Sequence, residues 1–460
     1  MQTKKKNIKA TVFYSIGTLG SKVVLFAIVP FLSFFLETKD LGQYDLILVS
    51  ITFITPLITI QISDALYRFL LDSDDEAYQN QIISTVLGSI LIGYALFLCI
   101  IFLINKWLDF EYIVEFVFLQ LCSCFYVFVQ QLVRGLKKNK WYAFMGILNA
   151  LFLVILTSLF INLTNLKLKG VLYALVFAQS TTIFITLLHT NIYRRLTLNL
   201  FDFNTIKQLV NYSWPLLPNA LSWWLIDLGN RYLILFYLDD ASNGIYAVAA
   251  RYAGIVAIIN TIFILTWQDF IISSKEDIRN NISKPFNSFM VFELSLIACF
   301  TTVSSEIVQF TTYYGYHDAG KYLPILFLSS GVAGLCGYFG AIYLRDKDTI
   351  GAFKTTIIGA IVNLMFCIFF INILELYAVA LGSLIGFLAT LLLRIRYFKV
   401  LINKKKATIY LFTFIIIFIQ QLFFNNNCIS LFLLIFTFIA FLSYNRKTIK
   451  SIKEVILKNK

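Results

Sequence analysis

The sequence predicts an all-α polytopic membrane protein, and three observations indicate this class. Of its 460 residues, 59% are hydrophobic and only 14% are charged, whereas about a quarter of a soluble chain is charged. The mean hydropathy is +0.78. The chain also contains about 14 apolar stretches of the roughly 20 residues that a helix needs to cross a bilayer. We therefore expect about 14 transmembrane helices joined by short loops.

The expected spans follow one another from the basic N-terminus. The first apolar stretch has no small-residue cleavage signal, so we expect it to be retained as a membrane span. The spans lie near residues 10–36, 42–63, 81–105, 112–133, 141–162, 169–192, 211–238, 244–271, 285–312, 322–344, 350–373, 377–398, 407–424 and 428–444.

Lysine and arginine are distributed unequally between the two sides of this topology. If the N-terminus is cytoplasmic, the inner segments hold 29 of the 38 basic residues and the outer loops hold only five. The positive-inside rule then predicts that both termini are cytoplasmic. One inner loop, 64–80, departs from this pattern because acidic residues replace the basic ones.

The chain repeats itself at an offset of about 200 to 215 residues. For example, Gly42-Gln43-Tyr44 corresponds to Gly244-Ile245-Tyr246. With six spans per half, both halves enter the membrane in the same direction, an arrangement typical of transporters. We expect an N-terminal six-helix lobe over 1–200, a second six-helix lobe over 201–400, and two additional helices with a basic cytoplasmic tail over 401–460.

Ionisable side chains at bilayer depth are candidates for function because their burial is costly. Several are cationic, and a cavity lined by arginine and lysine would attract a phosphate or another anion. Two of them, Arg68 and Lys354, lie near enough to the inner interface to extend towards water instead. The candidate cavity cations are Lys22, Arg68, Arg231, Arg251 and Lys354.

Three carboxylates have a different expected role, in ion pairing or coupling. Asp64 lies at the inner end of the second span, near Arg68. Asp227 is four residues before Arg231, so on a continuous helix the two would share a face and could pair. Glu293 could couple transport to a proton or cation, or it could remain a buried protonated acid.

The seventh span contains two further features. Pro215 and Pro218 remove backbone hydrogen bonds and could act as a hinge for alternating access, although a first helical turn also tolerates proline. Trp223 and Trp224 lie too deep for an interface belt. They could stack on sugar rings or pack between helices.

Metal and catalytic sites have little support in the sequence. The seven cysteines are mostly within apolar stretches and there are only two histidines, so we expect no disulfide framework and no metal. No Gly-rich phosphate loop or catalytic motif is present. We expect a protein that is not an enzyme.

Three segments resemble the polysaccharide transporter family of the MOP (multidrug, oligosaccharidyl-lipid, polysaccharide) exporter superfamily, especially O-antigen and capsule repeat-unit flippases. The most specific segment is Tyr212-Ser-Trp-Pro-Leu-Leu-Pro218, followed by Asp227-Leu-Gly-Asn-Arg231 and Gly244-Ile-Tyr-Ala-Val. The others are Leu41-Gly-Gln-Tyr-Asp-Leu, and Tyr313-Tyr-Gly through Tyr322-Leu-Pro324 with Asn363 later.

The resemblance implies a MATE-like transporter in the bacterial cytoplasmic membrane that moves an undecaprenyl-pyrophosphate-linked oligosaccharide to the outer leaflet for surface polysaccharide biosynthesis. In such proteins a cationic cavity is thought to hold the pyrophosphate and sugars. That role falls on Lys22, Arg231 and Arg251, and less directly on Arg68 and Lys354. Lys22 departs from the family, which often uses arginine in the first span.

The resemblance further implies that the protein needs no cofactor and binds no nucleic acid. It also implies that transport is coupled to a proton or sodium gradient or to the membrane potential. The expected protein partners are polysaccharide polymerase and the chain-length machinery. Three alternatives remain open. They are a cation-coupled multidrug exporter of the same superfamily, a membrane glycosyltransferase or polymerase, and a flippase for lipid II.

Overall fold

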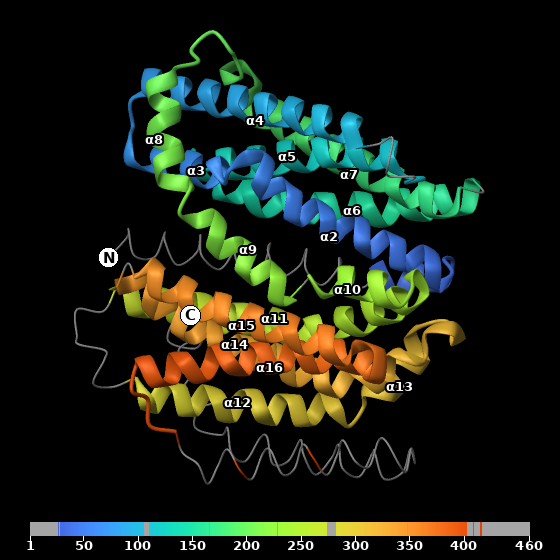
Figure 1. Cartoon of the computed structure of the whole chain (residues 1–460). Helices are drawn as coiled ribbons and strands as arrows, with labels where there is room; N and C mark the ends of the chain where they lie inside the picture. Colours follow the sequence, from blue (N-terminus) through green and yellow to red (C-terminus); the bar gives the residue numbers. More distant parts are fainter. Residues whose placement is uncertain are drawn as a thin grey trace, which may run out of the picture. The chain divides into compact units, whose positions relative to one another are not determined.

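The structure is a computed structural model that describes residue 26 and residues 28–104, 110–164, 166–227, 229–273, 282–346, 348–402, 408 and 415. Every regular element in this part of the chain is a helix (Figure 1). Lys22, most of the predicted first span and, apart from residues 408 and 415, the two predicted spans within 401–460 with their basic tail lie outside the described residues.

The chain packs as two compact units, and the first contains residues 43–224. Its central helix is α5, which packs against α3, α4, α6 and α7. The short amphipathic helix α8 runs across α3 and α4 (Figure 1). The elements that contribute to this unit are α2 (Thr38–Thr59), α3 (Ile62–Asp72), α4 (Glu76–Ile104), α5 (Ile113–Gly135), α6 (Asn139–Leu163), α7 (Lys167–Thr190), the 3-10 helix η1 (Ile192–Arg195), α8 (Phe203–Ser213) and α9 (Leu216–Asp227).

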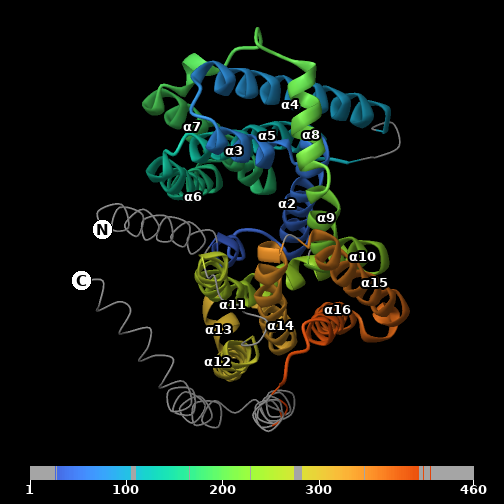
Figure 2. The same cartoon turned by 90° about the vertical axis from the view of Figure 1, so that its left-hand side faces the viewer.

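The second unit contains residues 29–42 and the described residues from 225 onward. Its elements are α10 (Asn230–Tyr237), α11 (Asp240–Ser273), α12 (Ser283–Thr301), α13 (Ser304–Thr311), the 3-10 helix η3 (Tyr314–Tyr316), α14 (Ala319–Asp346), α15 (Thr349–Leu374) and α16 (Leu376–Tyr397). Helix α14 is central, because it packs against α11, α12 and α16 (Figure 2). Within the apolar 18-residue segment of α14, 78% is buried inside the protein, compared with 28% for the corresponding segment of α15.

The poorly buried helices show what surrounds the protein. Helices α4, α6 and α15 expose large apolar side chains, such as Phe102, Ile155 and Phe369. A water-soluble protein rarely exposes apolar surface on this scale, whereas lipid-facing helices require it. Nine helices in the described ranges are long and apolar enough to cross a membrane, or ten if α12 and α13 form one bent span. The chain is therefore a multi-pass membrane protein.

Most predicted spans coincide with single helices, but two differ from the prediction. The stretch 211–238 contains the end of α8, then α9 and α10, because the helix is interrupted twice. The stretch 285–312 is divided into α12 and α13, which meet at an angle of 53°. Hydropathy alone does not reveal these interruptions, since the residues at each break remain mostly apolar.

Two glycines of the predicted repeat meet within the second unit, each as the fifth residue of its helix, Gly42 in α2 and Gly244 in α11. A Cβ atom on Gly42 would overlap the carbonyl oxygen of Asp240, and one on Gly244 would overlap the carbonyl oxygen of Thr38. The Asn243 side chain also donates a hydrogen bond to the Gly42 carbonyl, at 2.8 Å. The contact is reciprocal between equivalent positions, which agrees with the predicted internal repeat. Only glycine permits this approach of the two backbones.

Candidate functional site

The predicted cavity cation Arg231 lies in α10 and is buried, with 5% of its surface exposed. Its guanidinium carbon is 5.0 Å from the centre of the Tyr246 ring on α11. An arginine over an aromatic face gains a cation–π attraction that grows as water is removed. Tyr246 therefore helps to stabilise a positive charge in the interior of the second unit.

Arg251 lies on α11, about 16 Å along the helix from Asp240 at 1.5 Å per residue. Its side chain is half-buried. It makes no hydrogen bond or ion pair with any residue that the structure describes. Because a guanidinium has five N–H donors, Arg251 can offer a bidentate contact to an anion at this depth.

The helix that carries Arg231 is interrupted just before it. Helix α9 ends at Asp227 and α10 begins at Asn230. The prediction that Asp227 and Arg231 share a face assumed an unbroken helix, so that spacing argument does not hold here. The side chain of Asp227 lies outside the described structure. Gly229, between the two helices, has the lowest helix propensity of any residue except proline.

Two polar side chains from neighbouring helices, together with Asn230 of α10, stabilise this interruption. Asn363 on α15 donates to the Ile226 carbonyl oxygen at 3.4 Å and to the Asn230 Oδ1 atom at 3.1 Å. Asn230 in turn donates to the Ser383 hydroxyl on α16 at 2.8 Å. In a bilayer the backbone groups freed by a break must find partners inside the protein. Asn230 and Ser383 were not predicted as site residues, although an asparagine in an apolar stretch is a detectable signal.

The two prolines of the predicted hinge lie at the other interruption. Helix α8 ends at Ser213 and α9 begins at Leu216, so Pro215 is in the break and Pro218 is in the first turn of α9. The Ser222 hydroxyl donates to the Pro218 carbonyl oxygen at 2.8 Å. The chain is therefore bent at the prolines, and Pro218 also has the first-turn position that tolerates this residue.

Trp224 packs within the first unit. Its indole N–H donates to the Val49 carbonyl oxygen at 3.2 Å, and its ring centre is 4.4 Å from that of Phe53 on α2. These contacts favour the alternative in which Trp224 packs between helices, rather than stacking on a sugar. Trp223 is half-buried.

Two predicted cations are exposed rather than buried. Arg68 lies 3.4 Å from Asp72 on α3, and the two side chains are 54% and 58% exposed. Lys354 is exposed near the start of α15. Their positions favour the alternative of side chains that reach the interface. Asp64 is not paired with Arg68 but accepts a hydrogen bond from the Gln131 amide at 2.9 Å.

Glu293 is fully buried in α12. Neither carboxyl oxygen has a hydrogen-bond partner in the described part of the chain. A Cβ atom added to Gly331 on α14 would lie 3.3 Å from the Oε2 atom of Glu293, so the Glu293 carboxyl packs closely against that helix. An isolated carboxylate in such surroundings is strongly disfavoured. This environment favours the neutral, protonated acid.

Arg394 on α16 lies within the predicted span 377–398 and was not among the candidate cavity cations, but it is buried, with 1% of its surface exposed. Its guanidinium donates to the Cys336 carbonyl oxygen at 2.7 Å and to the hydroxyls of Thr355 and Thr356 at 3.1 and 2.9 Å. These bonds join α14, α15 and α16. Its helical spacing from Phe387 and Thr390, which are also buried, is the signal that could have identified it.

No metal-binding cluster of three or more His, Cys, Asp or Glu side chains occurs among the described residues.

Comparison with known proteins gave both a family and structural relatives. The family described as "Polysaccharide biosynthesis protein" matches residues 8–266. The lipid II flippase MurJ, in an inward closed conformation, is 16% identical with a TM-score of 0.74 over 95% of this chain and 100% of that chain. A mutant of the Vibrio cholerae MATE transporter VcmN is 14% identical with a TM-score of 0.63 over 86% and 97%.

An inward-facing multidrug resistance MATE transporter of the MOP superfamily is 12% identical, with a TM-score of 0.62 over 84% of this chain and 94% of that chain. Among curated proteins, no sequence match to the chain was found. At these identities the structural likenesses show the fold, which confirms the predicted MATE-like helical class. The family match covers more than half of the chain. The chain therefore belongs to the polysaccharide biosynthesis protein family.

Proposed function

We propose that this protein is a flippase that moves undecaprenyl-pyrophosphate-linked oligosaccharide repeat units from the cytoplasmic to the outer leaflet of a bacterial cytoplasmic membrane. The product would enter the biosynthesis of a surface polysaccharide such as O-antigen, capsule or exopolysaccharide. The family description supports polysaccharide biosynthesis. The MurJ-like fold, which extends over 95% of the chain, supports the flipping of a lipid-linked substrate.

The observation that carries the proposal is the state of Arg251. A guanidinium in the outer third of a predicted membrane span, half-buried and without a described partner, is costly unless it meets water or an anion. A pyrophosphate supplies several oxygens that accept bidentate hydrogen bonds. We assign pyrophosphate contact to Arg251 and Arg231, with Lys22 as a further candidate. Arg68 and Lys354 are assigned a weaker role at the entrance because they are exposed.

Alternating access of the two predicted six-helix lobes, with Pro215 and Pro218 as the hinge, would carry the head group across while the lipid tail stays in the bilayer. Both termini would be cytoplasmic. Glu293 would bind the coupling proton, since its carboxyl is buried without a described partner. Polymerase and chain-length proteins would receive the flipped repeat unit.

A cation-coupled multidrug exporter is the second candidate, because the MATE transporters share the fold. A cavity for cationic drugs is expected to be acidic or apolar, whereas Arg251 would repel such a drug. This difference favours the flippase.

The test is to delete the gene in its host and to determine by leaflet-selective labelling where lipid-linked oligosaccharide accumulates. We expect repeat units to be trapped on the cytoplasmic leaflet and surface polysaccharide to be lost. Normal polysaccharide would favour the drug exporter, and single repeat units on the outer leaflet would indicate a polymerase.

Complementation of the deletion then tests the cationic site. Arg251→Ala should abolish export while expression and membrane insertion remain normal, and Arg251→Lys should restore part of it. The matched control is Arg396→Ala, which removes an exposed arginine at the end of α16. Normal export with Arg251→Ala would rule out pyrophosphate binding by this residue.

A further inference from the structure

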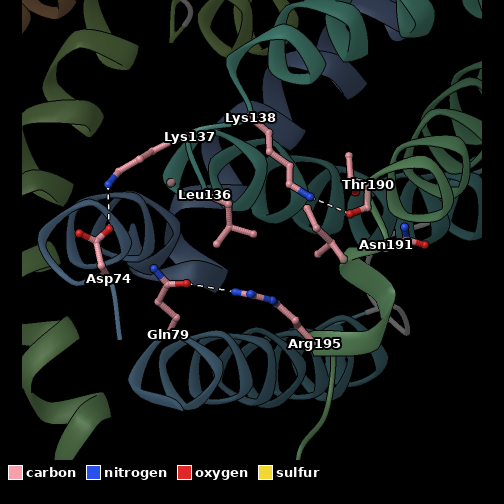
Figure 3. Close-up of a pocket in the computed structure, with 10 residues that line it drawn as sticks. Asp74, Gln79, Leu136, Lys137, Lys138, Thr190, Asn191 and Arg195 are labelled. Carbon is pink, nitrogen blue, oxygen red and sulfur yellow. Dashed lines mark hydrogen bonds and ion pairs between the residues drawn. The ribbon is translucent and has the colours of Figure 1, made fainter. Parts of the chain in front are cut away.

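The first unit contains a cavity of about 240 Å³ at the ends of α5 and α7. Figure 3 shows that it is bounded by the turn after α5 and by the segment between α7 and η1. Asp74, which precedes α4, and Gln79, in its first turn, complete the boundary. Its lining includes the basic residues Lys137, Lys138 and Arg195. None of its lining residues belongs to the proposed substrate site.

Two of the three cations are paired with carboxylates. The Lys137 ammonium is 2.9 Å from an Asp74 carboxyl oxygen, and both side chains are largely exposed. Arg195 forms an ion pair with Glu76 and also donates to the Gln79 side-chain oxygen at 3.0 Å. These pairs account for the acidic loop 64–80, which departs from the positive-inside pattern. Its carboxylates neutralise neighbouring basic loops.

Lys138 differs from the other two. Its ammonium donates to the Thr190 carbonyl oxygen at 2.7 Å, and it forms no ion pair in the described part of the chain. Lys138 and Arg195 both line the cavity, and Figure 3 shows the Lys138 ammonium directed at Thr190 and the Arg195 guanidinium directed at Gln79. Burial and the positive charge of Arg195 lower the pKa of Lys138. An anion between the two cations would relieve this repulsion.

The surroundings of the cavity place it at the level of lipid head groups. The ring of Trp141, in the first turn of α6, stacks on His189 with ring centres 5.4 Å apart. Near this stacked pair, Phe144 exposes 44% of its surface, Leu188 exposes 47% and Tyr193 exposes 44%. Exposed aromatic side chains at the ends of apolar helices are typical of the membrane interface. The positive-inside rule assigns this interface to the cytoplasmic leaflet.

We propose that this cavity binds the phosphate group of an anionic lipid of the cytoplasmic leaflet, held between the Lys138 ammonium and the Arg195 guanidinium. Lys138 has two N–H donors left after its bond to Thr190, and Arg195 has further donors of its planar fork. Basic pockets between membrane helices on the cytoplasmic side bind lipid head groups in this way. The lipid would be a bound companion of the first unit rather than the transported substrate.

The experiment measures binding of short-chain phosphatidylglycerol to the purified full-length protein in a neutral detergent. Phosphatidylcholine of the same chain length and inorganic phosphate are the comparison ligands. Lys138→Gln and Arg195→Gln should each weaken phosphatidylglycerol binding about fivefold, which corresponds to about 1 kcal/mol per charge. Lys138→Arg, which keeps the charge, should stay within about twofold of the unmodified protein.

Two matched controls come from the same loops. Lys140→Gln and Arg194→Gln remove the same charge from exposed residues that do not line the cavity, and should leave affinity nearly unchanged. Equal weakening by these controls would overturn the site, because it would show a general surface attraction. Phosphatidylcholine binding as tight as phosphatidylglycerol would also overturn it.

Inorganic phosphate separates the two sources of the phosphate group. If it competes as well as the lipid on an equal molar basis, the lipid assignment is wrong and the cavity binds a soluble anion. The melting temperature of each variant is measured alongside, since Lys138 also joins the turn after α5 to α7. Arg195→Gln keeps that bond but removes the ion pair with Glu76, so the two variants disturb different contacts and a loss of binding in both points to the shared cavity. No step requires the transported substrate, so the result is independent of the proposed function.

Discussion

Replacing Arg394 by alanine tests whether a buried arginine holds the second unit together. The substitution removes three hydrogen bonds, of 2.7 to 3.1 Å, that join α16 to α14 and α15. A bond from a charged donor contributes about 1.5–3 kcal/mol. Taking the lower value for each bond, Arg394→Ala should reduce the free energy of unfolding by about 4.5 kcal/mol. At about 2 °C per kcal/mol for a large chain, the melting temperature should fall by about 9 °C.

The assay is thermal unfolding of the full-length protein in detergent, followed by size-exclusion chromatography. Arg396→Ala is the matched control, because Arg396 lies two residues later on the same helix and is exposed. Exposed substitutions usually change stability by less than about 0.5 kcal/mol. If the two variants melt within about 1 °C of each other, a value well below the shift estimated from these bonds, the inference that Arg394 joins the three helices is refuted.

Three other substitutions test separate features. Asn363→Val should reduce unfolding free energy by about 1–3 kcal/mol because it leaves the Ile226 carbonyl unpaired, and an unchanged melting temperature would contradict this. Glu293→Gln should preserve thermal stability while removing the pH dependence of flipping measured in vesicles; a pH profile like that of the unmodified protein would exclude Glu293 as the proton site. Hydrogen bonds from Thr205 lower the pKa of Asp202, whose carboxylate caps the N-terminus of α8. The cap therefore stabilises α8 fully above about pH 4, and this stabilisation is lost as the pH falls through the pKa of Asp202 in the folded protein. Hydrogen exchange in the first turn of α8 should therefore quicken in acid relative to Asp202→Asn, and identical behaviour would contradict the cap.

The sequence was sufficient to predict the helical class and most of the helices. Long apolar stretches such as 81–105 and 350–373 have only one low-energy structure in lipid, because a helix satisfies every backbone group within itself. Their ends in the structure, at α4 and α15, are within a few residues of the prediction. The family resemblance is confirmed by the family match over residues 8–266, which contains the most specific of its motifs.

The candidate site was predictable only in part, because burial depends on how helices face one another. Arg251 and Arg394 are both arginines of apolar helices, yet one lacks a described partner and the other has three. Nothing local to either residue distinguishes them. Similarly, the pairing of Asp74 with Lys137 joins loops that are distant in the sequence. The sequence showed that the loop 64–80 is unusually acidic, but it did not show that Asp74 pairs with Lys137.

The reciprocal glycine contact has a consequence for how the two repeats can diverge. A gene duplication normally frees each copy to change alone. Here the backbone of α2 fills the space where a side chain on Gly244 would lie, and the backbone of α11 fills the space beside Gly42. A side chain gained at one position cannot be offset by a smaller residue at the other, because the obstacle is main chain. At this point the two halves must therefore keep the same residue, however different they become elsewhere.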